Sequence, residues 1–332
     1  MALGARAALG RIALTVARQI ASRQPLPVRD GVGASIIVVP DDAAQRWPSV
    51  FAFLQARFAH LPPDALSSRL ARGVIRRIDG TPLDANTACV PGDRWYYYRE
   101  IPDETNRFES ETIVFEDELL VVADKPHFMP VTPGGRYLQE TLLVRLRRRL
   151  GLDDLAPMHR IDRETAGLVV FTKRPDTRGR YQALFESRDV DKLYLAIAPS
   201  SLAPRLPMRA RHCIVQAAHF MQMRVSEDAD APINAECDIE LDALLGTSGL
   251  ARYRLKPLTG KKHQLRVQMA ALGVPIVGDQ IYPSLFDVAH EDPTHALQLL
   301  AKSISFVDPI SGQLRRFECQ RRLQQDIAPE NP

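Results

Sequence analysis

An aspartate between two arginines is the feature of this sequence with the clearest potential for chemistry. Asp162 lies between Arg160 and Arg163, and the apolar segment Leu168–Phe171 follows shortly after. Fixed positive charge within reach of a carboxyl group favours its ionised form. An ionised aspartate at the edge of a sheet can act as a covalent nucleophile or as an electrostatic stabiliser. Taken alone, such a segment is more commonly a surface turn with a salt bridge, so its interpretation depends on the flanking sequence.

The composition is that of a globular protein with about two domains. The chain has 332 residues, of which 45% are hydrophobic and 25% are charged, as is ordinary for globular proteins. No apolar run approaches the roughly 18 residues that a membrane-spanning helix needs, so we expect no membrane partner. The net charge of +3 is too small to identify a partner.

The cysteines favour neither a disulfide framework nor a metal site. They are widely scattered, without a C-x-x-C pair and without a matching histidine spacing. They are Cys89, Cys213, Cys237 and Cys319. We therefore predict no metal and a reduced, cytoplasmic compartment.

Residues 1–29 form a basic segment with five arginines and no acidic residue. Ile12, Val16 and Ile20 fall at helical spacing, which predicts a basic helical tail. A mitochondrial transit peptide is also Arg-rich and acid-poor. This segment has only one serine and no obvious processing site, which favours the tail.

Residues 30–100 are predicted to form a small module of helices and strands. A short strand at 35–39 precedes two helices at 50–58 and 67–75, and another strand follows at 94–99. The helices and the basic hairpin after them resemble a degenerate S4-type RNA-binding domain. The alternative is a generic N-terminal cap on the larger domain. Residues 101–110 are acidic, contain proline and are predicted to be a linker.

The rest of the chain predicts an α+β domain over 111–320, followed by a C-terminal tail over 321–332. Strands are expected at 112–115, 119–123, 168–173, 192–197, 252–255, 304–307 and 314–319. Helices are expected at 141–150, from an N-cap at Asp176 to 187, and from 263 to a stop at Gly273. Many short strands with interspersed helices favour a mixed, mainly antiparallel sheet with flanking helices over a doubly wound sheet.

Five blocks, in order, resemble the RluA-type pseudouridine synthases and extend over about residues 110–319. The segment around Asp162 is one of them. The blocks are 113–130, 159–173, 192–196, 258–279 and, more weakly, 306–312. The resemblance implies isomerisation of uridine in structured ribosomal or transfer RNA without a cofactor, and we expect a monomer.

The resemblance also implies the chemistry of the central aspartate. In that reaction the N-glycosidic bond breaks, the uracil turns over and a C-glycosidic bond forms. Asp162 matches the family's single essential aspartate, which would attack the anomeric carbon of the sugar or abstract a sugar proton. Arg266 matches the arginine that pairs with it. Tyr194 matches the tyrosine that stacks on the uracil and serves in proton transfer at C5.

Three further cations are implied as RNA contacts. Arg160 aligns with the arginine that fills the space left by the extruded base, a task that suits a planar guanidinium. Lys125 stands where the family places a lysine near the rim of the active site, and a structural salt bridge is an equal alternative. Lys262, with Lys261, replaces the usual Arg-Thr or Arg-Ser before a helix N-terminus, which favours phosphate.

Two other classes of function compete with this hypothesis. A non-catalytic RNA-binding protein on the same fold would not need Asp162, Tyr194 and Arg266 together. A glycoside hydrolase normally needs two carboxyl groups about 5–10 Å apart. Glu164 is the only obvious partner for Asp162, and two residues along a loop it need not face the same way.

Overall fold

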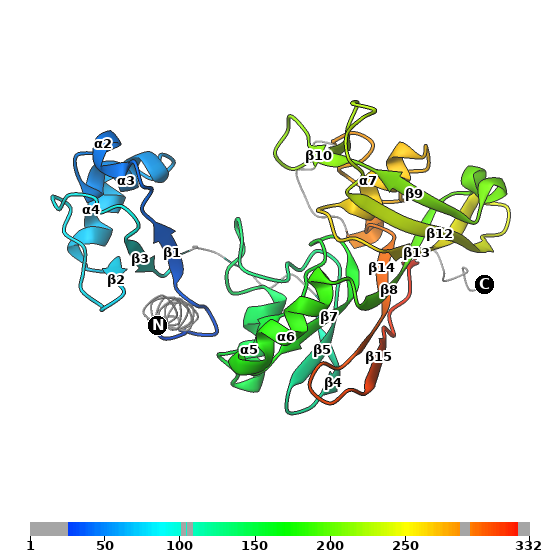
Figure 1. Cartoon of the computed structure of the whole chain (residues 1–332), viewed down its shortest axis with the longest axis horizontal. Coiled ribbons are helices and arrows are strands. Elements are labelled where there is room, and N and C mark those ends of the chain that lie inside the picture. The colour runs from blue at the N-terminus through cyan, green and yellow to red at the C-terminus, as the bar shows by residue number, and fades with distance from the viewer. Residues whose placement is uncertain (1–25, 101–103, 105–108, 286–292, 325–332) are drawn as a thin grey trace, which may run out of the picture. The chain divides into compact units, whose positions relative to one another are not determined.

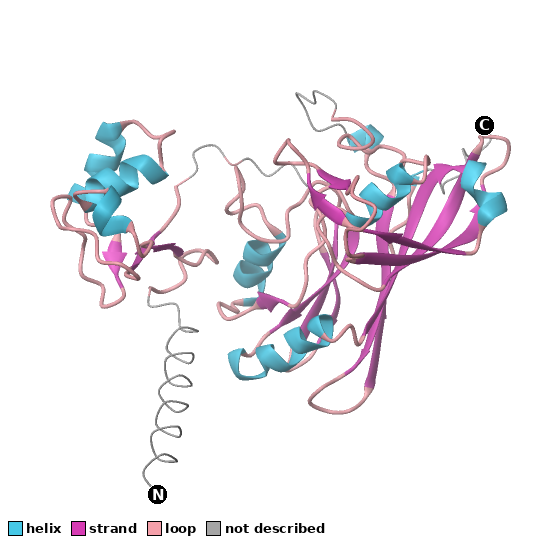
Figure 2. Ribbon diagram, turned by 45° about the horizontal axis from the view of Figure 1, so that its top comes forward, coloured by secondary structure: helices cyan, strands magenta, loops and turns pink. Residues whose placement is uncertain are grey.

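The computed structural model describes residues 26–100, 104, 109–285 and 293–324. The chain divides into two compact units, Met1–Asp103 and Glu104–Pro332, and each is described by itself (Figures 1 and 2). Most of the predicted basic tail and most of the predicted linker lie outside the described residues. No helix of the described part combines the length and apolar composition needed to cross a bilayer.

The described part of the first unit contains three strands and three helices. The sheet order is β1-β3-β2 and both pairs are antiparallel. The elements are β1 (Ser35–Val38), α2 (Ala43–Arg46), α3 (Val50–Arg57), α4 (Pro63–Ala71), β2 (Arg76–Arg77) and β3 (Arg94–Tyr97). Trp95 is fully buried between the helices and the sheet, so this aromatic side chain serves the core. The S4-type resemblance and the RNA binding of this unit stay predictions.

The helix expected at 67–75 begins and ends four residues earlier. Pro63 occupies its first turn, where a missing N–H costs no hydrogen bond. Gly73 then takes a positive φ of 62°, which ends the helix.

The second unit contains a ten-stranded sheet. Its main path is β4-β5-β7-β14-β8-β13-β12-β9, with β15 on β14 and β6 on β7. All these pairs are antiparallel except β7 with β14. The strands are β4 (Thr112–Glu116), β5 (Leu120–Lys125), β6 (Ala156–Pro157), β7 (Ala166–Thr172), β8 (Val190–Pro199), β9 (Met208–His212), β12 (Ala235–Leu244), β13 (Leu250–Pro257), β14 (Leu299–Val307) and β15 (Leu314–Glu318). The predicted mixed, mainly antiparallel sheet with flanking helices is confirmed.

Helices and a separate hairpin complete this unit. The helices are α5 (Leu142–Leu150), α6 (Pro175–Glu186) and α7 (Gln264–Ala271), with short 3-10 turns at Ser200–Arg205 and Pro293–His295. The strands β10 (Ile214–Gln216) and β11 (Met223–Val225) form the hairpin.

Strands β5 and β7 are buried on both faces, which explains their nearly continuous apolar sequence. The side chains of Val121 and Val169 pack with α5, whereas those of Val122 and Val170 lie in the cluster that contains Tyr181 of α6. The two helices therefore cover opposite faces of this part of the sheet. Further along, α7 packs on β8, β12 and β13.

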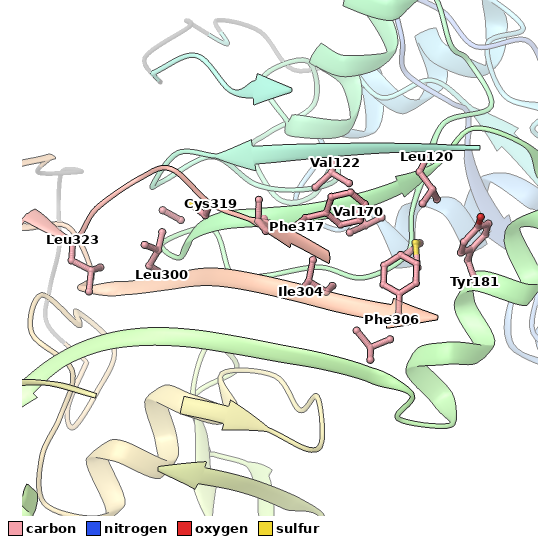
Figure 3. Packing of buried hydrophobic residues seen from close by; sticks show 14 of the residues in the cluster. Leu120, Val122, Val170, Tyr181, Leu300, Ile304, Phe306, Phe317, Cys319 and Leu323 are labelled. Atoms are coloured by element: carbon pink, nitrogen blue, oxygen red, sulfur yellow. The ribbon is translucent and has the colours of Figure 1, made fainter. Parts of the chain in front are cut away.

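One apolar cluster joins the strands that carry the predicted site. Val122, Val170, Ile304 and Phe317 come from four different strands and lie around one space (Figure 3). At about 25 cal/mol per Å² of apolar surface removed from water, such burial is the main stabilising contribution to the fold.

Three sequence-based expectations are corrected. Asp176 is not the N-cap of α6: Arg174 holds that position, and Asp176 pairs with it from the first turn. The strand β12 was missed because its acidic residues mask the period-2 pattern of Ala235, Cys237 and Ile239, which are buried. Part of the predicted C-terminal tail is packed, since the side chain of Leu323 is fully buried.

The parallel contact between β7 and β14 requires a glycine. Gly167 has a φ of 112°, and a Cβ placed there would lie 2.4 Å from the carbonyl oxygen of Ala301. We expect Gly167→Ala to lower the free energy of unfolding by about 3 kcal/mol, through backbone strain and collision together. Gly151→Ala is the control, because Gly151 also has a positive φ but no neighbour within 4 Å. Urea denaturation measures both, and equal losses would contradict the collision.

Candidate active site

Residues from three separate segments meet in one cleft of about 630 Å³. Asp162 lies on the loop between β6 and β7, and Tyr194 lies on β8. His263 and Arg266 come from the start of α7. All four side chains line this cleft, so the structure brings together residues that are up to 104 positions apart in sequence.

Arg266 is the fully buried cation at the centre of the site. Its Nε and Nη2 atoms donate to the two carboxylate oxygens of Asp279 at 2.8 and 2.7 Å. Its remaining nitrogen, Nη1, lies 3.4 Å from Oδ2 of Asp162 and 3.3 Å from Oε2 of Glu164. Burial alone would lower the pKa of Arg266, but the bonds to Asp279 and the charges of the other two carboxylates raise it. The guanidinium is therefore permanently charged and points one nitrogen at Asp162.

The arginines that flank Asp162 in sequence are not its partners in space. Arg163 bonds to Glu164 at 2.9 Å and to the hydroxyl of Tyr137 at 2.9 Å. Arg160 is exposed on the lining of the cleft and makes no ion pair within the described residues. Asp162 therefore does not pair with the arginines next to it in sequence, and it contacts Arg266, the partner that the family resemblance implies. Arg160 stays available to a ligand in the cleft.

Glu164 faces the same guanidinium as Asp162, which sequence reasoning left open. Burial alone would raise its pKa, but the positive charges of Arg266 and Arg163 lower it overall. Glu164 is therefore ionised at neutral pH. Its side chain contacts both Arg266 and Arg163 and is only 15% exposed.

Lys125 is fully buried, so it cannot touch RNA, and its expected place at the rim of the site is corrected. Its Nζ donates to the carbonyl oxygens of Pro126 at 2.9 Å and Arg163 at 3.0 Å. Next to it, Nδ1 of His127 donates to the carbonyl oxygen of Glu164 at 2.6 Å. Lys125 and His127 therefore hold the backbone of the loop that carries Asp162.

Tyr194 and Lys262 differ in how they relate to the cleft. The ring of Tyr194 lines the cleft, and burial together with the charge of Asp162 raises the pKa of its hydroxyl. Lys262 lies outside the lining and donates to the carbonyl oxygen of Phe220 in the loop between β10 and β11, at 3.1 Å. Lys261 lines the cleft instead.

Sequence reasoning missed Asp279, His263 and Tyr282. Asp279 follows Gly278, and a Cβ at Gly278 would lie 2.3 Å from a backbone carbonyl oxygen of Ala296. In the sequence, the glycine indicates that another backbone segment can approach closely at this point, and the aspartate after it places a charge there. His263 and Tyr282 carry no such signal, because their contact at 2.9 Å joins a helix start to a loop. Within the described residues no group of three His, Cys, Asp or Glu side chains could hold a metal ion, and all four cysteines are free.

We expect Asp279→Asn to destabilise the protein strongly, because it leaves the buried guanidinium of Arg266 undercompensated. The free energy of unfolding should fall by about 3 kcal/mol or more. Asp238→Asn is the matched control, since Asp238 also binds an arginine through both oxygens, at 2.6 and 2.8 Å, but does so on the surface. The free energy of unfolding of Asp238→Asn should fall by much less. Urea denaturation of the two variants would contradict this account if their losses were similar.

Lys125 predicts a pH dependence of stability. Burial lowers its pKa from 10.5 to about 7, against the opposing charges of Glu164 and Asp162. Between these values the unfolded chain binds more protons than the folded chain, so the free energy of unfolding rises with pH. We expect wild type to gain stability relative to Lys125→Met from pH 7 towards pH 10. Denaturation across that range measures the difference, and a constant difference would contradict a neutral buried amine.

Comparison with known proteins agrees with the sequence resemblance. Residues 119–271 match the family described as RNA pseudouridylate synthase. The chain is 31% identical over 201 residues to the tRNA pseudouridine(31) synthase of Saccharomyces cerevisiae, covering 56% of this chain and 49% of that protein. It is 28% identical over 209 residues to the dual-specificity RNA pseudouridine synthase RluA of Salmonella typhi, covering 62% of this chain and 91% of that protein.

A solved structure shares the fold. Human RNA pseudouridylate synthase domain containing 1 has a TM-score of 0.52 at 22% identity, over 67% of this chain and 94% of that chain. The match spans about half the length of the yeast relative and 31% of human pseudouridylate synthase RPUSD2. Residues 119–271, less than half of the chain, thus match the RNA pseudouridylate synthase family, and the sequence is similar to that of the RluA enzyme of Salmonella typhi.

Proposed function

We propose that this protein isomerises uridine to pseudouridine in structured RNA, with Asp162 as the single catalytic carboxylate. The observation that carries the proposal is the meeting of three groups in one cleft. These are the carboxylate of Asp162, the buried guanidinium of Arg266 at 3.4 Å and the ring of Tyr194. An aromatic ring beside a carboxylate suits a nucleoside, because the ring stacks on the base while the charge acts at the sugar.

The reaction makes few demands beyond an anion and a sheltered base. The bond from N1 of uracil to C1′ of ribose breaks, and a bond from C5 to C1′ forms. C5 then loses its proton, and N1 gains a proton. No electrons are gained or lost overall. Asp162 would attack C1′ or take a proton from the sugar, and either step needs an ionised carboxylate. Arg266, which is itself fully buried, supplies the compensating charge.

Tyr194 and Arg160 would serve the base. The raised pKa of Tyr194 keeps its hydroxyl protonated at neutral pH, so it suits stacking and hydrogen-bond donation better than action as a base. A base within folded RNA must be extruded before it reaches such a cleft, at a cost of a few kcal/mol. The exposed guanidinium of Arg160 can occupy the vacated place and contact phosphate.

The substrate would be transfer or ribosomal RNA. The yeast relative is named a tRNA synthase, and the bacterial relative carries the name of a dual-specificity RNA enzyme. Their names support an RNA substrate for this chain. A monomer in a cytoplasmic compartment, acting without a cofactor, stays a prediction.

The competing functions fit the site less well. A glycoside hydrolase needs one carboxyl group with a raised pKa as its acid, and the pKa of Glu164 is lowered. RNA binding alone does not require a buried arginine whose Nη1 atom contacts the carboxylates of both Asp162 and Glu164. The costly burial of that charge is understandable if chemistry depends on it.

We expect Asp162→Asn to abolish pseudouridine formation while RNA binding stays within about tenfold, because the carboxylate serves chemistry more than affinity. Mapping of pseudouridines in total RNA from cells that lack the gene, complemented with wild type or variant, measures the activity. Asp176→Asn is the control, as it removes an acid that is exposed on α6. Full activity of Asp162→Asn would refute the assignment, and release of free uracil by wild type would point to a hydrolase.

A further inference from the structure

His263 stands beside the oxygen of Asp162 that Arg266 does not bind. Arg266 approaches Oδ2 of Asp162, whereas Nε2 of His263 lies 4.0 Å from Oδ1. The carboxylate therefore has one oxygen tied to the buried cation and one facing the histidine. Hydrogen bonds in unliganded active sites are often longer than in the working complex, so a closure of about 1 Å would make this contact a hydrogen bond.

The other ring nitrogen of His263 is held by Tyr282. Its Nδ1 lies 2.9 Å from the hydroxyl of Tyr282, and the two rings meet edge to face at 85°. The same hydroxyl accepts a hydrogen bond from the backbone N–H of Met223 at 2.8 Å. Tyr282 thus holds one side of the His263 ring, and the other side faces the cleft. The side chain is only 10% exposed.

Hydrogen-bond accounting within the described residues favours one tautomer of His263. A tyrosine hydroxyl has one proton to donate and accepts through its lone pairs. No other acceptor for this proton is found among the described residues, so the hydroxyl donates to Nδ1. Nδ1 is then the acceptor and Nε2 carries the hydrogen of the neutral ring. In the opposite tautomer the hydroxyl proton of Tyr282 would have no acceptor among the described residues. The lone pair of Nε2 would then face the carboxylate of Asp162.

Burial keeps this ring neutral. It lowers the pKa of His263 more than the negative charges of Asp162 and Glu164 raise it, and Arg266 and Lys262 act in the same direction as burial. These groups and Tyr282 are the charged and titratable side chains that face His263. The ring therefore offers Asp162 a hydrogen-bond donor without adding a second positive charge.

The backbone of His263 is shaped for this position. Its φ of 55° is left-handed, a conformation that few residues other than glycine adopt but that histidine adopts more readily than most, and it directly precedes α7. Its side chain does not cap the helix, although residues at this position commonly do. A strained conformation at a functional site is commonly retained because the side chain is needed there.

We propose that His263, as the neutral Nε2–H tautomer set by Tyr282, positions Oδ1 of Asp162 and thereby selects it as the reacting oxygen. This inference rests on the proposed function of Asp162. His263 acts through Asp162 and is a positioning residue. The same arrangement would serve attack on C1′ or abstraction of a sugar proton, because both use a carboxylate oxygen of fixed direction.

Two substitutions of His263 separate the donor from the rest of the side chain. The amide nitrogen of glutamine reaches about as far as Nε2, whereas that of asparagine reaches only as far as Nδ1. Asparagine tolerates a left-handed backbone, so His263→Asn keeps the local fold but loses the donor to Asp162. We expect kcat of His263→Asn to fall by about tenfold to a hundredfold with KM within about threefold. His263→Gln should recover most of kcat.

The pH profile gives a readout that a purely structural role would not change. Loss of a donor makes the carboxylate easier to protonate, so the acid limb of kcat should move to higher pH in His263→Asn and return in His263→Gln. An unchanged kcat in His263→Asn, or equal losses in both variants, would overturn the inference. If wild type forms no pseudouridine in any RNA, the proposed function fails instead.

A measurement independent of activity tests the tautomer directly. The ¹⁵N chemical shifts of the imidazole distinguish Nε2–H from Nδ1–H in the intact protein. We expect the neutral Nε2–H form at pH 7, and a mixture of tautomers in Tyr282→Phe. Observation of Nδ1–H in wild type would overturn the inference whatever the activity.

Discussion

The burial of one guanidinium is the constraint on which the site depends. Arg266 has no exposed surface, and a charge in that environment is tolerated only when it is paired and hydrogen-bonded on every side. Asp279 satisfies two of its nitrogens, and the third is shared by Asp162 and Glu164. Two acids therefore gather where mutual repulsion alone would keep them apart. The position of Asp162, the carboxylate that we propose to be catalytic, is therefore set by its contact with the buried guanidinium of Arg266.

Hydrogen bonds and apolar packing around Arg266 hold the loop of Asp162 and the helix α7 in place. The loop with Asp162 is held by the amine of Lys125 and the ring of His127, both of which donate hydrogen bonds to its backbone carbonyl groups. Such contacts to carbonyl groups direct the backbone without adding a group to the cleft. The apolar packing of α7 on the sheet fixes Arg266, and a glycine lets two parallel strands approach closely beside the loop. Packing sets the position of each charge, and the charges then set each other's protonation states.

Much of this could be predicted from sequence where the signal was local. The strands β4, β5 and β7 and the helix α5 have strong patterns, and their positions were predicted to within a few residues. The chemistry assigned to Asp162, Tyr194 and Arg266 came from the family resemblance of the sequence blocks that contain them. The pairing of Asp162 with Arg266 was predicted only through the family resemblance, because proximity in sequence alone favours Arg160 and Arg163 as partners. Lys125 was misjudged for a related reason: a lysine at a strand end is normally exposed, and only the completed sheet shows that it is enclosed.

The order of strands has a consequence for the synthesis of the protein. The last long strand, β14, lies in the middle of the sheet, between β7 and β8. It joins the half that carries Asp162 to the half that carries Tyr194 and Arg266. As the chain leaves the ribosome, neither half can find its place beside the other until residues 299–307 have emerged. A nascent chain would therefore hold its reactive groups apart, and the cleft would close into working form only near the end of translation.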